Sequence, residues 1–233
     1  MTVVVPRDAP GMKVNAAVFL GAQVVRYDRH ADDRDAITRA LAAEHGHMIV
    51  PSADDRLVMA GAGTVALEFL EQAPGLAVIL VPVGGGGLAA GTAVAAKAVN
   101  SAIRVIGVEP STGADTAASL RARRRATLPA VPDTIADGLR QTSPAPLPWE
   151  VNKVLLDDVF TVTDDQIARA MQWAFEHLKI VAEPSGAAAL AALTNTGLPP
   201  GPTGVVISGG SVDWRTFQAI TASLDRTTEA AVA

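Results

Sequence analysis

Residues 76–96, LAVILVPVGGGGLAAGTAVAA, contain no charged side chain and carry four consecutive glycines in their middle. The segment is long enough to cross a bilayer. However, Pro82 and the glycines would break a helix that faces lipid. We therefore expect a buried strand, a glycine loop and a buried helix in succession, and no association with a membrane.

Short β-branched runs alternate with helical patterns along the rest of the chain. Strands are expected at residues 2–5, 23–27, 48–50, 77–81, 103–108, 159–162 and 204–207. Helices are expected at 12–20, 31–44, 57–71, 88–99, after the capping-box pattern Thr163-Asp164-Asp165-Gln166, and at 184–193. This order predicts an α/β protein in which helices cover both faces of a parallel sheet. We expect a small lobe of residues 1–53, a large lobe of residues 54–233, and a long proline-rich connection at 128–148.

Composition excludes several classes of protein. Of the 233 residues 49% are hydrophobic, so a disordered chain is not expected. The formal net charge of −5 gives no basic field for nucleic acid. The chain has no cysteine, which excludes a thiol nucleophile, a disulfide framework and a cysteine zinc site, and fits a reducing cytoplasm. The start, MTVVVPRDAP, lacks the pattern of a signal peptide.

The glycine loop predicts an anion site. A strand that ends in Gly84, Gly85, Gly86 and Gly87 and runs into a helix presents backbone N–H groups at the positive end of that helix, most often to phosphate. A dinucleotide is one alternative, because the next strand ends in the acid Glu109. The spacing G-x-G-x-x-G is not met, since alanine stands at the third glycine position, and no Walker lysine follows.

A second loop, EPSTGAD, carries Glu109 and Asp115 on either side of Gly113. Two carboxylates and backbone carbonyls can supply hard oxygen ligands to Mg²⁺ or Ca²⁺. The alternative is a solvated loop in which Asp115 caps the next helix. The residues of this loop leave both interpretations open.

A series of segments resembles the threonine dehydratase and serine racemase branch of the fold-type-II pyridoxal-phosphate enzymes. In order, these are VVVPRDAPGMKV, LGAQVVRYD, MAGAGTVALEFLEQ, VPVGGGGLAAG, RVIGVEPSTGAD, PDTIADGL, DDVFTVTDDQI, KIVAEPSGAAALAAL and VVISGGSVD. The resemblance covers nearly the whole chain. It implies two open twisted sheets of parallel type flanked by helices, with pyridoxal 5′-phosphate as the cofactor.

The resemblance also implies roles for particular residues. The glycines 84–87 and the Leu88 N–H would hold the cofactor phosphate, and the Ser208 hydroxyl would bind the pyridine nitrogen. Glu109, the Gly113 carbonyl and Asp115 would hold Mg²⁺ or Ca²⁺. Ser211 departs from the family, which usually has asparagine at that position.

The motifs S-F-K-x-R-G and S-S-G-N-H, which carry the family's Schiff-base lysine and its substrate loop, do not occur in the chain. Its lysines are Lys13, Lys97, Lys153 and Lys179, and the resemblance places Lys13 on an ordinary surface helix. We therefore expect an N-terminally truncated enzyme that has no catalytic lysine of its own and is nearly inert alone.

The resemblance implies a complete enzyme that is a homodimer and converts L-threonine or L-serine into a 2-oxo acid and ammonia. One alternative is a non-catalytic half-enzyme or pseudoenzyme, which could associate with a chain that supplies the lysine. The other is a dinucleotide-binding dehydrogenase domain.

Overall fold

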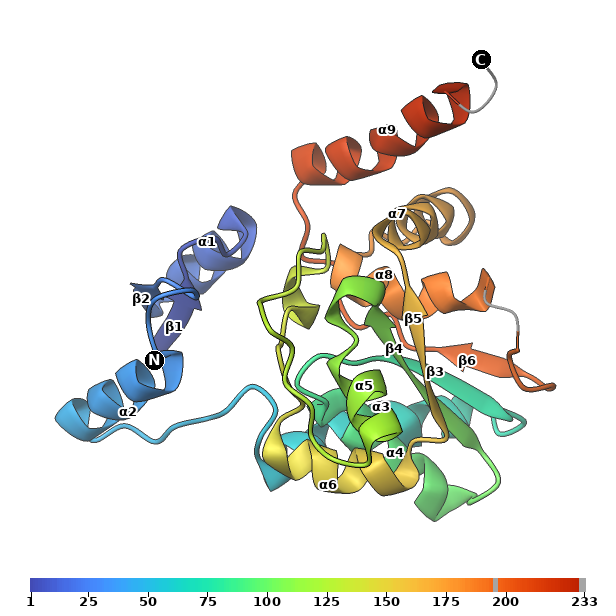
Figure 1. The fold of residues 1–233 in the computed structure, drawn as a ribbon, viewed down its shortest axis with the longest axis horizontal. Helices are drawn as coiled ribbons and strands as arrows, with labels where there is room; N and C mark the ends of the chain where they lie inside the picture. Colours follow the sequence, from blue (N-terminus) through green and yellow to red (C-terminus); the bar gives the residue numbers. More distant parts are fainter. Residues whose placement is uncertain (195–196, 231–233) are drawn as a thin grey trace.

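A computed structural model describes residues 1–194 and 197–230 of the chain, those from 223 on by their backbone alone. Two parallel sheets organise these residues (Figure 1). The small sheet pairs β1 (Thr2–Pro6) with β2 (Gln23–Tyr27), starting at Thr2 opposite Gln23. The large sheet has the order β5-β4-β3-β6. The predicted α/β class with parallel sheets is confirmed.

Helices connect these strands. The small lobe contains α1 (Gly11–Phe19) and α2 (Arg34–His45). The large lobe contains, in chain order, α3 (Arg56–Gln72), β3 (Val78–Pro82), α4 (Gly87–Val99), β4 (Arg104–Pro110), η1 (Ser111–Gly113), α5 (Asp115–Ala122), η2 (Asp137–Leu139), α6 (Pro146–Leu155), β5 (Asp158–Val162), α7 (Asp164–Trp173), a π-helical turn η3 (Ala174–Leu178), α8 (Pro184–Ala191), η4 (Ala192–Thr194), β6 (Thr203–Val205) and α9 (Trp214–Ala230).

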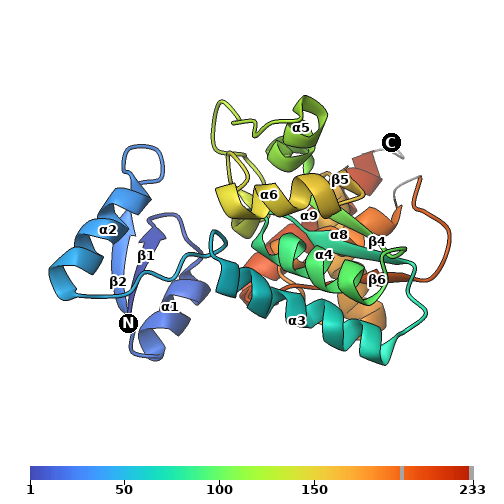
Figure 2. The same cartoon turned by 90° about the horizontal axis from the view of Figure 1, so that it is seen from below.

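The core of the large lobe lies on both faces of its sheet. Every residue of β3 is buried, and successive side chains of a strand point to opposite faces. Val78 and Leu80 accordingly pack with residues of α7 and α8, whereas Ile79 and Val81 pack with residues of α3 and α4. Figure 2 shows α3 and α4 together along one side of this sheet. Burial on both faces explains why the strand is apolar without alternation.

The expected strand at 48–50 is wrong. These residues have no regular secondary structure and are exposed, with Met48 at 86% and Val50 at 70%, and no neighbouring strand among the described residues pairs with them. Strand propensity without a pairing partner does not make a strand. The boundary proposed between residues 53 and 54 falls in the segment without helix or strand that joins α2 to α3.

Three further expectations concern the capping box, the proline-rich connection and the absence of a membrane-spanning helix. The capping box is confirmed, because the Gln166 N–H donates to Thr163 Oγ1 at 3.2 Å and the Thr163 N–H donates to Gln166 Oε1 at 2.8 Å. The connection ends earlier than expected, since α6 begins at Pro146, where a proline is compatible with the first helical turn. Within the described part of the chain, no helix is both long and apolar enough to cross a membrane.

Candidate functional site at the carboxyl edge of the large sheet

The glycine loop and Ser208 leave the large sheet at the same edge. Strands β3 and β6 are parallel neighbours, with Leu80 opposite Val205, and each continues directly into one of these segments. Open α/β sheets bind ligands outside the carboxyl ends of their strands. The structure therefore brings together the two segments for which the sequence predicts cofactor contacts. The Ser208 residue is exposed there.

The start of α4 provides hydrogen-bond donors. Gly86 precedes the helix with φ of 91°, a conformation that favours glycine. The Ala90 N–H donates to the Gly86 carbonyl at 2.9 Å. The N–H groups of Gly87 and Leu88 precede it and have no intrahelical acceptor by geometry. These groups, at the positive end of the helix, are suited to an anion such as a phosphate.

Close contacts with the protein also require glycine in this loop. A Cβ at Gly84 would lie 2.6 Å from Gln141 Oε1 and 2.9 Å from the Gly138 carbonyl oxygen. At Gly85 and Gly87 it would lie 3.0 Å from atoms of Ala53. The sequence favoured a bound ligand over a tight turn as the reason for four glycines. The structure adds a second reason, and it shows that neighbouring segments hold the loop in place.

Two side-chain amides lie beside the loop, those of Asn152 and Gln141, and neither was predicted from the sequence. The Asn152 Nδ2 group donates to the Gly86 carbonyl at 3.1 Å. Asn152 Oδ1 and Gln141 Oε1 are buried without a hydrogen-bond partner. Such orphaned atoms are uncommon in folded proteins and suit a site that holds a polar ligand. Both orphaned atoms are acceptors and do not bind a phosphate themselves, so it is the N–H donors at the start of α4 that fit the phosphate end of pyridoxal phosphate.

A charged cluster lies beside the Ser208 segment. The Lys13 ammonium is 2.9 Å from Asp137 Oδ2 and 2.8 Å from Glu183 Oε2. Burial alone would lower the pKa of Lys13, but the hydrogen bonds to Glu183 and Asp137 outweigh it, so the pKa is raised. The helix α1 lies largely exposed at the surface, as the resemblance implied, but it directs the Lys13 side chain toward acidic partners in the large lobe. No local sequence signal could reveal a partner 124 residues away.

The remaining lysines also have partners. Lys97 pairs with Asp157 at 2.8 Å, Lys153 pairs with Glu150, and the Lys179 ammonium donates to the Glu176 carbonyl at 2.7 Å.

Glu109 and Asp115 lie close together and are almost fully buried, with 0% and 1% exposed. The Thr116 and Ala117 N–H groups donate to the two oxygens of Glu109 at 2.8 and 2.9 Å. Glu109 thus satisfies the start of α5, whereas Asp115 Oδ2 is buried without a partner. Burial, and then the charge of Glu109, raise the pKa of Asp115 to about 8. Burial also raises the pKa of Glu109.

This arrangement excludes one of the two interpretations of the loop. A solvated loop capped by Asp115 is wrong, because both carboxyl groups are buried and Glu109 accepts the N–H groups of α5. Because both carboxylate oxygens of Glu109 accept these N–H groups, Glu109 is poorly placed to bind the hydroxyl groups of a ribose. Among the described residues no group of three or more histidine, aspartate and glutamate side chains is placed to hold a metal ion. A cation would therefore need the Gly113 carbonyl as well, and its binding stays a prediction.

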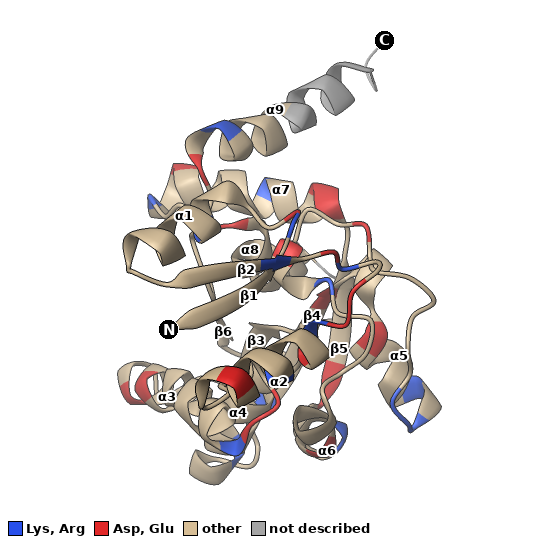
Figure 3. Cartoon of the chain, turned by 90° about the vertical axis from the view of Figure 1, so that its left-hand side faces the viewer, with Lys and Arg blue, Asp and Glu red and all other residues tan. Residues whose placement is uncertain are grey.

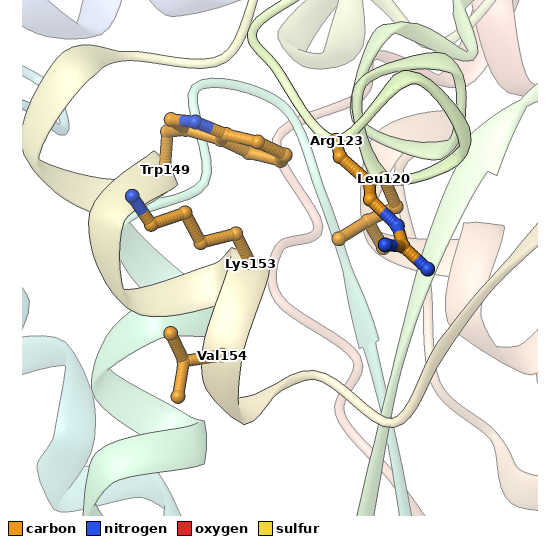
Figure 4. Close-up of a pocket in the computed structure, with 5 residues that line it drawn as sticks. All are labelled: Leu120, Arg123, Trp149, Lys153 and Val154. Atoms are coloured by element: carbon orange, nitrogen blue, oxygen red, sulfur yellow. The ribbon is translucent and has the colours of Figure 1, made fainter.

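A separate cavity of about 410 Å³ lies between α5 and α6 (Figure 4). Its lining residues are Leu120, Arg123, Trp149, Lys153 and Val154. None of them belongs to the glycine loop or the Ser208 segment, so the cavity is not part of the candidate site. Figure 4 shows the Lys153 and Arg123 side chains directed away from each other.

Comparison with known proteins agrees with this geometry. The family model for "Pyridoxal-phosphate dependent enzyme" matches residues 1–209. The chain belongs to this family. Members of the family use pyridoxal phosphate, which agrees with the cofactor predicted from the sequence.

Several curated relatives resemble the chain. It is 37% identical over 218 residues to L-threo-3-hydroxyaspartate ammonia-lyase of Saccharomyces cerevisiae, covering 93% of this chain and 67% of the relative. It is 39% identical over 227 residues to serine racemase of Arabidopsis thaliana, with 93% and 68% covered. It is 38% identical over 221 residues to L-threonine ammonia-lyase of Geobacter sulfurreducens, with 94% and 55% covered.

Solved structures of similar proteins also superpose on the chain. Maize serine racemase superposes with a TM-score of 0.87 at 36% identity, covering 97% of this chain and 71% of that one. The processed form of threonine deaminase isoform 2 from Solanum lycopersicum superposes with a TM-score of 0.85 at 29% identity, covering 95% and 65%. The chain thus spans between 55% and 71% of the length of these relatives and solved structures.

Proposed function

We propose that this chain provides the cofactor-holding part of a pyridoxal-phosphate-dependent ammonia-lyase, which converts L-threonine or L-serine into a 2-oxo acid and ammonia. The observation that carries the proposal is the common sheet edge of Ser208 and the start of α4. Ser208 supplies a hydroxyl that suits the ring nitrogen of the cofactor. The start of α4 supplies backbone N–H groups that suit the phosphate of the same cofactor. The presence of ammonia-lyases among the relatives supports this reaction class.

Each group has a defined task in this proposal. The N–H groups of Gly87 and Leu88 bind the phosphate, and the loop 84–87 keeps side chains away from it. Bound pyridoxal phosphate supplies an electron-accepting ring for removal of the α-proton of an amino acid. The Ser208 hydroxyl orients this ring through its nitrogen. A neutral hydroxyl, unlike a carboxylate, does not hold that nitrogen protonated, which favours elimination over transamination.

The proposal includes further elements that the sequence suggested. Glu109, Asp115 and the Gly113 carbonyl would hold Mg²⁺ or Ca²⁺ behind the end of β4. The complete enzyme would be a cytoplasmic homodimer that acts on a free amino acid. A non-catalytic half-enzyme remains the alternative, because the residues assigned here bind the cofactor and none of them forms a covalent bond to it.

The first test measures cofactor binding by equilibrium dialysis with pyridoxal phosphate. Ser208→Ala should weaken binding, whereas Ser101→Ala, a matched change at an exposed residue after α4, should not. Equal affinity in all three proteins would remove Ser208 from the site. Retention of NAD that is insensitive to Ser208→Ala would support a dinucleotide-binding domain instead.

The second test measures activity. The segment that precedes the matched region in the Arabidopsis relative would be joined to Met1 of this chain, and the chimera assayed for 2-oxo acid release from L-threonine and L-serine. Formation of D-serine without 2-oxo acid would assign a racemase. A folded chimera that binds the cofactor but changes neither amino acid would favour the non-catalytic alternative.

A further inference from the structure

The two lobes meet through charged side chains. The helices and strands of the small lobe end at His45, and the single segment 46–55 joins them to α3 of the large lobe (Figure 1). Within the part of the chain that the structure describes, both clusters of buried apolar residues begin at or after Ala66. The small lobe therefore contributes nothing to either core. Figure 3 shows where positively and negatively charged residues lie along the ribbon of both lobes.

Lys13 makes the closest ion pairs between the lobes among the described residues. Its ammonium contacts Asp137 Oδ2 at 2.9 Å and Glu183 Oε2 at 2.8 Å, and the three side chains are 30%, 25% and 13% exposed. The pair of Asp8 with Arg140 is longer at 3.4 Å, and Asp8 is 46% exposed. Water and salt screen an exposed pair more strongly than a partly buried one. Lys13 should therefore dominate the contact.

Both partners of Lys13 belong to segments that touch the candidate cofactor site. Gly138 follows Asp137, and its carbonyl oxygen lies 2.9 Å from the position that a Cβ of Gly84 would take. The Glu183 N–H donates to the Gly209 carbonyl at 3.0 Å, next to Ser208. One ammonium thus connects the small lobe to both ends of the site.

The segment between the lobes has a defined anchor. Ala53 packs against Gly85 and Gly87, the Leu147 N–H donates to Asp54 Oδ1 at 2.7 Å, and Asp55 caps α3. Residues 46–50, by contrast, are exposed and without regular structure beyond the turn at Gly46. Movement of the small lobe would therefore occur about residues 46–52, while residues 53–55 stay fixed to the glycine loop.

We propose that Lys13 is a positioning residue that holds the small lobe over the cofactor site by charge, with residues 46–52 as the hinge. A role for this closed arrangement in catalysis rests on the proposed function. The effect of Lys13 on the arrangement of the two lobes does not depend on that function. An ion pair of this kind contributes about 1 kcal/mol, which corresponds to about a fivefold change in the ratio of closed to open molecules.

The experiment uses the absence of native cysteine in the chain. Cysteines introduced at the exposed residues Ala43 of α2 and Arg169 of α7 would carry spin labels, and pulsed electron paramagnetic resonance would measure the distances between them. The test variant is Lys13→Met, and Lys13→Arg retains the charge. The matched control is Lys97→Met, which breaks the 2.8 Å pair with Asp157 inside the large lobe.

We expect Lys13→Met to shift the distribution to longer and broader distances, and Lys13→Arg to restore it largely. About 1 M NaCl should produce a smaller shift in the same direction in the wild-type chain, because salt screens a partly buried pair incompletely. Lys97→Met should have no effect. A distribution unchanged by Lys13→Met, or changed equally by Lys97→Met, would overturn the proposal.

Hydrogen exchange separates movement of the lobe from its unfolding. The amides of β1 and β2 should stay protected in Lys13→Met, since their pairing lies within the lobe. Loss of that protection would also overturn the proposal, because Lys13 would then stabilise the lobe itself. All measurements are made without cofactor. A failure of pyridoxal phosphate to bind would therefore refute the proposed function and leave this result unaffected.

Discussion

Substitution of a glycine at the crossing of α3 and α4 tests the helix packing that supports the candidate site. Gly63 and Gly91 lie at this crossing, and a Cβ at Gly91 would collide with the Met59 carbonyl oxygen and lie 2.7 Å from the Gly63 nitrogen. These are backbone atoms, so no side-chain rotation can relieve the overlap. Gly91→Ala must push the two helices apart.

The magnitude follows from two opposing effects. Overpacking of a core costs about 1–3 kcal/mol. Replacing a helical glycine by alanine regains about 0.5–1 kcal/mol. Because the overlapping atoms belong to the backbone, the cost lies in the upper part of this range, and the net loss of about 1–2.5 kcal/mol lowers the melting temperature by roughly 2–10 °C in a chain of this size. Because α4 carries the glycine loop one turn before Gly91, affinity for pyridoxal phosphate should fall as well.

Gly61→Ala is the matched control on α3. A Cβ at this exposed glycine meets no atom within 4 Å. The substitution should therefore raise the melting temperature by roughly 1–4 °C and leave cofactor affinity unchanged. Thermal unfolding followed by circular dichroism measures both variants. If Gly91→Ala melts at or above the wild-type temperature, the close approach of the two helices is wrong.

Four further outcomes are expected. Divalent cation at ten times its dissociation constant should add about 1.4 kcal/mol of stability, and Glu109→Ala or Asp115→Ala should abolish the rise in melting temperature. Without cation, the free energy of unfolding should decrease as the pH rises from about 4 toward about 8, because the folded chain binds the Asp115 proton more tightly than the unfolded chain does; urea unfolding of Asp115→Asn should lack this part of the slope. Pyridoxal phosphate should bind the chain weakly and reversibly, so that a stoichiometric absorption band retained after desalting, beyond what Ser208→Ala retains, would contradict the assignment of the lysines. Light scattering should detect self-association, since Phe19 and Leu20 are 89% and 80% exposed; a single monomeric or dimeric species would refute this.

The parts of the fold that could be predicted are those determined by residues close together in the sequence. The capping box depends on Thr163 and Gln166, three positions apart, and both of its bonds form. The strand, loop and helix of the uncharged segment follow one another directly. The strand expected at 48–50 failed for the opposite reason, because a strand needs a partner that its own residues cannot supply.

The same distinction explains which parts of the candidate site were predictable. In a parallel sheet, the residues that follow successive strands all emerge at one edge, so Gly84 after β3, Ser208 after β6 and Glu109 at the end of β4 could be placed together once the strands were recognised. Lys13 and Asp137 follow no strand of that sheet, and the amide of Asn152 reaches the loop from the middle of α6. Their positions depend on how helices and connections pack over the edge, and no spacing in the sequence encodes that packing. The groups that would bind the cofactor are thus set by the sheet, whereas those that hold the loop and the small lobe in place are set by tertiary contacts.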